Sequence, residues 1–337
     1  MHILVTSAGR RSYLIRYFKE ALGGDGKVYA SNSSYTIALK EADGYFISPL
    51  IYDDTYIDSL LSFCKKKNIK TILSLFDIDL LVLSRAKAYL ESQGIRLLLP
   101  EENTILTCND KWRTYMFLCR HGLKTPKTYK SLKTTKEAIK NKQISYPVIV
   151  KPRWGMGSMG LYTADNKEEL EVFYRKCLKE VRSTHLKYES TLTPKEPVIF
   201  QEMLKGEECG VDVINDLEGN FVCALPKVKM AMRAGETDLG KMVGASRFLP
   251  VAKILSEKIK HEVILSVDCF DVNGDIYVLE MNCRISGHYP VSHMAGANLP
   301  KQIVEWLKGE PTNMQNFKYK KGVVVTKDLV PVVLDGI

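Results

Sequence analysis

The chain has 337 residues, 45% of them apolar and 26% charged, a composition typical of a globular protein with two or three domains. It contains no run of about 18 apolar residues, so no membrane span is expected, and its first residues do not resemble a signal peptide. The formal net charge of +9 comes from dispersed lysines without interleaved aromatic residues, which argues against nucleic acid as the partner.

The first hundred residues alternate between predicted strands and predicted helices. Apolar stretches indicate the strands, and apolar residues three and four positions apart indicate the helices. The predicted strands are residues 2–8, 27–32, 69–75 and 95–100, and the predicted helices are residues 11–22, 55–68 and 80–94. Such alternation is typical of a parallel sheet with helices on both faces, so residues 1–104 are predicted to form a doubly wound, Rossmann-like domain.

The pattern changes after residue 104. Strands are predicted at 146–152 and 161–164, on either side of a glycine-rich loop, and residues 183–197 are predicted to be a loose polar loop. Later strands at 208–216 and 221–230 flank the turn sequence LEGN, and strands at 267–272 and 276–282 flank NGD. The other predicted elements are an extended segment at 124–132, a strand at 198–204, helices at 109–122, 166–182, 254–266 and 300–309, and one or two terminal strands within 321–335.

The eight cysteines are scattered along the chain. None forms a C-x-x-C pair, and none lies near a histidine at the spacing of a zinc site. Scattered cysteines are typical of reduced thiols, so the sequence predicts a cytoplasmic protein without a zinc centre.

Residues 148–164, VIVKPRWGMGSMGLYTA, contain the pattern G-x-G-x-x-G at Gly155, Gly157 and Gly160. A dinucleotide-binding loop would open a helix, but here a short β-like stretch follows, so the loop joins two strands. A kinase loop precedes its lysine, whereas Lys151 comes before these glycines, and no Walker Lys-Ser/Thr pair follows them. Backbone N–H groups of such a hairpin can close over phosphates that Lys151 also reaches. A mobile hairpin without a ligand is the alternative.

Glu280 and Asn282 stand two positions apart at the end of an apolar strand, so their side chains point to one face. A carboxylate beside an amide oxygen suits Mg²⁺ that also binds phosphate. Asp268, on the preceding hairpin strand, is a further candidate ligand, and Arg284 follows on the same face. The alternative is a solvated edge strand. The stretch IYVLEMN is too apolar for that, and a carboxylate that ends such a run needs a partner.

Four motifs, in this order, resemble those of the ATP-grasp superfamily, most closely its carbamoyl-phosphate synthase large-subunit-like branch. They are NDK (109–111), YPVIVKPRWGMGSMG (146–160), FQEMLKGEECGVDV (200–213) and VLEMNCRISGHYP (278–290). With the N-terminal ILVTSAGRRSYLIR they cover nearly the whole chain. The resemblance implies α/β and α+β architecture, in which a doubly wound parallel-sheet (pre-ATP-grasp) domain precedes a two-lobed ATP-grasp fold. The implied boundaries are 1–104, 105–312 (small lobe about 124–203, C-terminal lobe about 204–312) and a strand-rich tail at 313–337.

The resemblance also implies a role for each matching residue. Lys111 and Lys151 resemble the lysines that hold the phosphates of ATP, and Glu208 resembles the acid that binds the ribose. The other implied nucleotide contacts are Gly155, Met156, Gly157 and Ser158 in the flap and Gln201, Glu202, Met203 and Leu204 at the adenine. The implied ligands of Mg²⁺ or Mn²⁺ are Asp268, Glu280 and Asn282, and Arg284 would steady the transferring phosphate or an oxyanion. Cys283 stands where the family usually has proline, and Gln201 replaces a common acid.

The stretch 225–243 is predicted to face the substrate. If it is a strand that runs into a loop, Lys227, Lys229 and Arg233 alternate toward a cleft. Lys229 and Arg233 are the predicted catalytic residues, because related ligases carry basic residues there. An exposed basic strand is the alternative.

For three further pairs of residues, the sequence leaves two possible roles open. His288 and His293 are either acid–base groups or hydrogen-bonding loop residues. Arg10 and Arg11 follow the first strand and could hold a carboxylate or phosphate. Asp77 and Asp79 either receive an amine or cap the helix that follows.

The predicted function is therefore that of an ATP-dependent ligase, which joins a small carboxylic acid, such as an amino acid or a carboxylated sugar, to an amine. The acid would pass through an acyl phosphate, with release of ADP and phosphate. The expected partners are small molecules rather than nucleic acid or membrane, and a homodimer is compatible with the resemblance. The alternatives are an enzyme that phosphorylates bicarbonate or carbamate, and a non-catalytic ATP-binding module.

Overall fold

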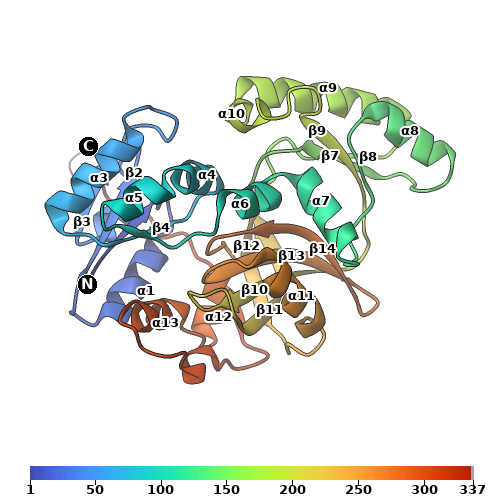
Figure 1. Ribbon diagram of the computed structural model, residues 1–337. Coiled ribbons are helices and arrows are strands. Elements are labelled where there is room, and N and C mark those ends of the chain that lie inside the picture. Colours follow the sequence, from blue (N-terminus) through green and yellow to red (C-terminus); the bar gives the residue numbers. More distant parts are fainter. Residues whose placement is uncertain (335–337) are drawn as a thin grey trace.

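The N-terminal part of the chain forms a five-stranded parallel sheet (Figure 1), in the computed structural model that describes residues 1–334. Its strand order is β3-β2-β1-β4-β5, and every pair is parallel, as predicted. The strands are β1 (His2–Thr6), β2 (Lys27–Asn32), β3 (Gly44–Ile47), β4 (Thr71–Ser74) and β5 (Arg96–Leu97). The helices are α1 (Ser12–Leu22), α2 (Ile37–Glu41), α3 (Tyr56–Lys67), α4 (Asp77–Arg85) and α5 (Lys87–Ser92).

The apolar pattern explains why these elements form. Ile3, Leu4 and Val5 of β1 are fully buried, as expected of a parallel strand covered on both faces. Helix α1 ends at Gly23, whose left-handed backbone suits a glycine cap. The sequence analysis did not predict α2 and β3, both of which are short. It also predicted one helix at 80–94, whereas two helices meet at Ala86, whose backbone leaves the helical region.

The middle of the chain forms a four-stranded antiparallel sheet with its own core. Helices α6 (Glu102–Asn109) and α7 (Lys111–Arg120) lead into β6 (Thr128–Tyr129), β7 (Val148–Pro152), β8 (Tyr162–Ala164) and β9 (Val198–Glu202), in the order β6-β9-β7-β8. Helices α8 (Leu132–Lys140) and α9 (Lys167–Ser183) contribute to its apolar core. The predicted loop at 183–197 also holds a short helix, α10 (Lys187–Ser190), with Glu189 buried.

The last part forms a six-stranded antiparallel sheet in the order β14-β13-β10-β11-β12-β15. Its strands are β10 (Glu207–Asn215), β11 (Phe221–Arg233), β12 (Glu236–Met242), β13 (Ile264–Val272), β14 (Asp275–Asn282) and β15 (Val324–Thr326). Its helices are α11 (Leu249–Ile259), α12 (Tyr289–Met294) and α13 (Leu299–Leu307), followed by a 3-10 turn at Met314–Phe317. Both predicted hairpins are confirmed. The predicted tail is confirmed as one strand, β15, although residues 335–337 lie outside the described part.

Two predictions for this sheet are wrong. The predicted helix at 254–266 begins earlier and ends at Ile259, because Lys260 takes a left-handed cap conformation and residues 264–266 belong to β13. The stretch 225–243 is not a strand that runs into a loop. It is the β11–β12 hairpin, and the two turn residues Ala234 and Gly235 both have positive φ, as tight hairpin turns require.

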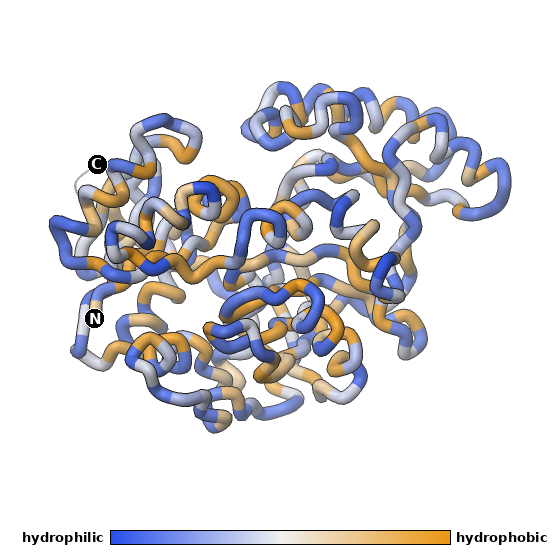
Figure 2. Tube along the Cα trace, in the orientation of Figure 1, coloured by the Kyte–Doolittle hydropathy of each residue, from blue (hydrophilic) through white to orange (hydrophobic). Residues whose placement is uncertain are grey.

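The smaller antiparallel sheet (β6–β9) and the larger one (which includes β10–β14) occupy different parts of the molecule, and α6 and α7 run between the parallel sheet and the smaller antiparallel sheet (Figure 1). Apolar segments concentrate in the inner strands, and hydrophilic segments on the outer turns and loops (Figure 2). The parallel sheet and the six-stranded sheet share two apolar clusters, whereas the small sheet has a cluster of its own. None of the helices within residues 1–334 combines the length and apolar character needed to cross a bilayer.

Candidate active site

A cavity of about 580 Å³ lies between the two antiparallel sheets, a size suited to a nucleotide. Most of the predicted site residues line it: Lys111, Lys151, Gly155, Met156, Gly157, Ser158, Gln201, Glu202, Met203, Leu204, Glu208, Lys229, Asp268 and Glu280. Asn282 lines a small adjoining cavity that shares Lys111, Gly155, Met156 and Glu280 with the large one. Apolar walls that the sequence analysis did not single out come from Ile149, Leu161, Phe270 and Leu279.

The glycine loop joins β7 to β8, which pair in antiparallel fashion, so the predicted strand–loop–strand arrangement is confirmed. Gly155, Gly157 and Gly160 all have positive φ. A Cβ on Gly160 would come within 2.9 Å of the Pro152 ring, so only glycine fits. At its tip, Gly157 lies so close to Gly235 of the β11–β12 turn that a Cβ on Gly235 would collide with it. The loop therefore forms one wall of the cavity and reaches the opposite sheet.

Two lysines approach the cavity from different elements. Lys151, on β7, is buried, and its Nζ donates to Oε1 of Gln201 at 2.7 Å. Burial lowers the pKa of Lys151 to about 8, although the charge of Glu280 opposes this shift. Lys111, at the start of α7, donates to the carbonyl of Gly155 at 2.5 Å, and its Nζ lies 3.7 Å from Oε2 of Glu280. The pair supplies positive charge to one end of the cavity.

The opposite wall carries carboxylates. Asp268 on β13 and Glu280 on β14 are register partners, so their side chains lie next to one another. Lys229 forms ion pairs with Oδ1 of Asp268 at 2.5 Å and with Oε1 of Glu208 at 3.1 Å. Burial, with the nearby Glu280 charge, raises the pKa of Asp268 despite Lys229. Burial alone would raise the pKa of Glu280 as well, but Lys111, Lys151, Lys229 and Arg284 together hold it below its usual range.

This donor set fits a hard cation that shares its ligands with a nucleotide. Among residues 1–334, no three His, Cys, Asp or Glu side chains are grouped so that they could hold a metal by themselves. The adjacent carboxylates of Asp268 and Glu280 and the amide of Asn282 offer oxygen donors, and the nearby lysines suit phosphate oxygens. Magnesium prefers this combination to a cage made only of protein groups.

Arg284 does not line the large cavity. Its guanidinium binds both oxygens of Asp77, at 2.8 and 2.6 Å, and so joins the end of β14 to the start of α4. Asp79 is fully buried and accepts hydrogen bonds from Thr6, Ser7, Ser74 and Tyr56. The carboxylates of Asp77 and Asp79 are thus held by tertiary contacts, and neither caps α4.

Lys227, Lys229 and Arg233 are predicted to alternate toward one cleft, but of the three Lys229 alone lines the cavity. The β11–β12 pairing contains two register shifts after Lys229, which interrupt regular alternation near the turn. Lys229 reaches the cavity, whereas Lys227 is fully buried beside Asp212 and Ser292. Arg233 binds Asp238 and the carbonyl of Lys327 and is not among the residues that line the cavity. A catalytic role for Arg233 stays a prediction.

His288 is buried, whereas His293 is half-buried. His288 lies with Nδ1 3.2 Å from Oδ1 of Asp212, and burial, reinforced by Lys227 and Lys229, lowers its pKa well below the usual range. His293 stacks on Tyr17 with ring centroids 3.5 Å apart, and burial lowers its pKa to about 4. Arg11 already binds Glu236 at 3.0 Å and the carbonyl of Leu75.

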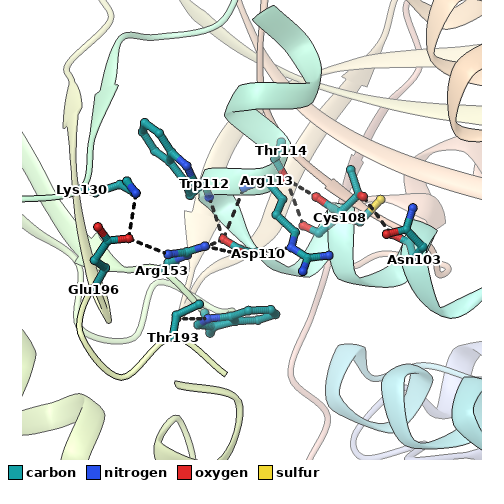
Figure 3. Close-up of polar contacts among 12 residues, drawn as sticks. Asn103, Cys108, Asp110, Trp112, Arg113, Thr114, Lys130, Arg153, Thr193 and Glu196 are labelled. Carbon is teal, nitrogen blue, oxygen red and sulfur yellow. Dashed lines mark hydrogen bonds and ion pairs between the residues drawn. The ribbon is translucent and has the colours of Figure 1, made fainter. Parts of the chain in front are cut away.

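A buried ion pair that the sequence analysis missed holds the glycine loop against α7 (Figure 3). Asp110 is fully buried, caps α7 through the backbone N–H of Trp112, and accepts two hydrogen bonds of 2.7 Å from Arg153. The carbonyl of Arg153 in turn accepts from the backbone N–H of Lys111 at 3.1 Å. These bonds place Lys111 and the loop that begins at Gly155 in one rigid arrangement. The only sequence signal was an aspartate in the first turn of the helix predicted at 109–122.

We expect Asp110→Ala to lower the free energy of unfolding by about 3–5 kcal/mol, because Arg153 would remain buried with only its 3.2 Å contact to Glu196. Urea denaturation followed by circular dichroism measures this change. Arg113→Ala is the matched control, since its side chain is half exposed and lies 3.7 Å from Asp110. Equal, small effects of the two substitutions would contradict the anchoring role of Asp110.

Comparison with known proteins decides the family. Residues 3–98 match the PylC-like N-terminal domain, and residues 108–288 match the ATP-grasp domain, which is more than half of the chain. The chain belongs to the ATP-grasp family. The resemblance and the fold class predicted from the sequence are both confirmed, while the exact domain boundaries stay predictions.

Relatives within this family are distant. The large chain of carbamoyl phosphate synthase from Clostridium acetobutylicum is 23% identical over 291 residues, which are 83% of this chain and 25% of that protein. The chain spans a quarter or less of the length of such curated relatives.

Two solved structures share the fold. The biotin carboxylase domain of 2-oxoglutarate carboxylase from Hydrogenobacter thermophilus, solved with MgADP, ADP and bicarbonate, has a TM-score of 0.72 and 20% identity, covering 94% of this chain and 72% of that one. An L-amino acid ligase from Bacillus licheniformis has a TM-score of 0.68 and 19% identity, covering 95% and 77%.

Proposed function

We propose that this protein is an ATP-dependent carboxylate–amine ligase that works through an acyl phosphate and releases ADP and phosphate. One observation carries the proposal: Lys111 and Lys151 face Asp268 and Glu280 across a single cavity that a glycine hairpin borders. Cations for phosphate and oxygen ligands for a divalent ion thus converge where a γ-phosphate would lie. This is the arrangement that phosphoryl transfer to a carboxylate requires.

The nucleotide would bind along the cavity. The apolar walls formed by Ile149, Phe270 and Leu279, with residues 201–204, suit an adenine ring, and Glu208 suits the ribose hydroxyls. Lys229, which now binds Glu208 and Asp268, would exchange these partners for phosphate oxygens. Each of these contacts rests on the position of the residue in the cavity and on the family resemblance.

The chemistry needs charge neutralisation rather than a nucleophilic side chain. A carboxylate is unreactive toward amines because its oxygen is a poor leaving group, and phosphorylation converts that oxygen into a good one. Lys111 and Lys151 would hold and neutralise the transferring phosphate. Asp268, Glu280 and Asn282 would hold Mg²⁺, which supplies charge neutralisation at the phosphate oxygens when it is bound. Arg284 binds Asp77, which lines the small adjoining cavity.

An enzyme that phosphorylates bicarbonate or carbamate is the second candidate, and the similarity to carbamoyl phosphate synthase chains favours it. The similarity of the fold to an L-amino acid ligase supports the carboxylate–amine reaction instead. The small-molecule partners, the predicted homodimer and a cytoplasmic location are parts of the proposal that oligomer and substrate measurements can test.

Nucleotide product analysis tests the proposed function. The protein is incubated with Mg-ATP, pooled L-amino acids and pooled uronic acids, and ADP is separated from AMP. Pool-dependent ADP and phosphate are the expected result, and division of the pools identifies the acid and the amine. ADP formed with bicarbonate alone would favour the second candidate. AMP with pyrophosphate would contradict the acyl-phosphate mechanism.

A further inference from the structure

The short helix α10 presents a buried carboxylate to the candidate active site. Glu189 is 4% exposed and lines the small cavity together with Lys111, Asn282 and Asp77. Its Oε2 atom has no hydrogen-bond partner within the described part of the chain. None of the motifs that resemble the family includes this residue, and the mechanism proposed above does not use it.

A buried carboxylate oxygen that lacks a hydrogen-bond partner lowers the stability of the folded protein, so its presence requires an explanation. Burial, followed by the negative charge of Asp77, raises the pKa of Glu189 to about 7, although Lys111 opposes the shift. Lys111 is already engaged by the carbonyl of Gly155 and by Glu280, and Arg284 is engaged by Asp77. Asp77 and Lys111 are thus both engaged by other groups, and within the described residues no cation is paired with Glu189, so a cationic ligand would supply its missing partner.

The helix that carries Glu189 is held in place from both sides. The ring of Tyr188 stacks on Tyr52 of the N-terminal domain, with centroids 4.3 Å apart. On the other side, Leu186 packs so closely on Gly155 that a Cβ there would lie 3.0 Å from it. Nε1 of Trp154 donates to Thr193 at 2.7 Å. Glu189 is thus a positioned group, set where the N-terminal domain, the glycine loop and the carboxylate wall meet.

We propose that Glu189 binds the ammonium group of the amine substrate and accepts a proton from it, an inference that rests on the proposed ligase function. Loss of that proton leaves a lone pair on nitrogen, which attacks the acyl carbon. The new C–N bond forms as the C–O bond to phosphate breaks, and the departing phosphate accepts the second proton lost by nitrogen. No oxidant or further reactant is needed.

The test separates the amine step from formation of the acyl phosphate. Hydroxylamine is uncharged at neutral pH and traps acyl phosphates as hydroxamates, so it does not need a carboxylate to bind it or remove a proton. For Glu189→Gln we expect hydroxamate formation with ATP and the active acid to stay within about threefold of wild type. We expect kcat/KM for the amine substrate, assayed with L-amino acids one at a time, to fall about 10²-fold or more. Glu168→Gln, an exposed carboxylate on α9, is the matched control.

Each other outcome has a definite meaning. An equal fall in hydroxamate and amine product would place Glu189 in the first step or in folding, and an unchanged amine reaction would remove it from the site, so either result overturns the inference. Wild-type protein that forms neither ADP nor hydroxamate with any acid would instead overturn the proposed ligase function itself.

Thermal unfolding gives a second readout that does not depend on substrate. At pH 8 we expect Glu189→Gln to raise the Tm of the full chain by about 1–3 °C, because the substitution removes a buried charge without a partner. Glu168→Gln should leave Tm unchanged. A lower Tm for Glu189→Gln would mean that the carboxylate stabilises the fold, and would overturn the binding role.

Discussion

Replacing Lys151 with methionine is expected to lower the ATP-dependent turnover by about 10²–10³-fold while the protein stays folded. Lys151 is buried at the end of the cavity where the phosphates would lie, and methionine keeps most of its volume without the charge. The measurement is steady-state ADP release with the active acid and amine. Lys133→Met, an exposed lysine on α8, is the matched control.

The stability of the Lys151→Met protein distinguishes a functional from a structural lysine. Because burial lowers the pKa of Lys151, its charged form destabilises the fold below about pH 8, and removal of that charge does not cost stability at pH 7. The substitution also removes the hydrogen bond that Lys151 donates to Oε1 of Gln201, and this loss lowers the stability of the variant. The melting temperature is therefore expected to stay near that of wild type. A wild-type rate of ADP release would remove Lys151 from the site.

Replacing Glu280 with glutamine is expected to lower turnover by a similar or larger factor and to weaken its dependence on Mg²⁺. The carboxylate lies beside Asp268 and 3.7 Å from Lys111, so its loss removes a metal ligand and leaves the nearby cations uncompensated. Turnover is measured against Mg²⁺ concentration. Asp275→Asn, an exposed carboxylate on the same strand, should behave as wild type.

The pKa of Glu280 also predicts how stability depends on pH. Its folded pKa lies below the usual value, so the carboxylate stabilises the protein above that value, and the contribution is lost as pH falls through the folded pKa. Glu280→Gln should therefore be less stable than wild type at pH 7, with a smaller difference in acid. An unchanged Mg²⁺ dependence in the variant would contradict the assignment of Glu280 as a ligand.

Much of the candidate site was predictable because its signals are local. The glycines at 155, 157 and 160 follow an apolar strand and precede another, and that order alone indicated a hairpin rather than a helix-opening loop. The turn sequence NGD set the hairpin that brings Asp268 opposite Glu280. Turn chemistry and the two-residue repeat of a strand act within a few residues, so a single sequence reveals them.

Two other local predictions, the end of one helix and the orientation of Arg233, are wrong because the sequence signal at these positions is weak. The helix predicted at 254–266 ends early because Lys260 and Val263 adopt positive φ. Positive φ is not typical of lysine or valine, so the sequence does not predict it. Arg233 binds Asp238 in a β11–β12 pairing that contains two register shifts, although strict alternation predicts that it points into the cavity. In both cases the packing of the surrounding sheet outweighs the preference of the residue.

The sequence by itself determined the class of fold, the ATP-grasp motifs and most of the residues that line the candidate site. Only the tertiary structure decided the ionic partners. Arg284 pairs with Asp77, Arg153 pairs with Asp110, and Oε2 of Glu189 has no hydrogen-bond partner among residues 1–334. Arg284 and Asp77 are 207 residues apart, and their pairing depends on how the parallel sheet packs on the six-stranded one. The physical reason is that periodicity and turns report interactions between chain neighbours, whereas burial and charge pairing depend on elements that meet only in the folded chain.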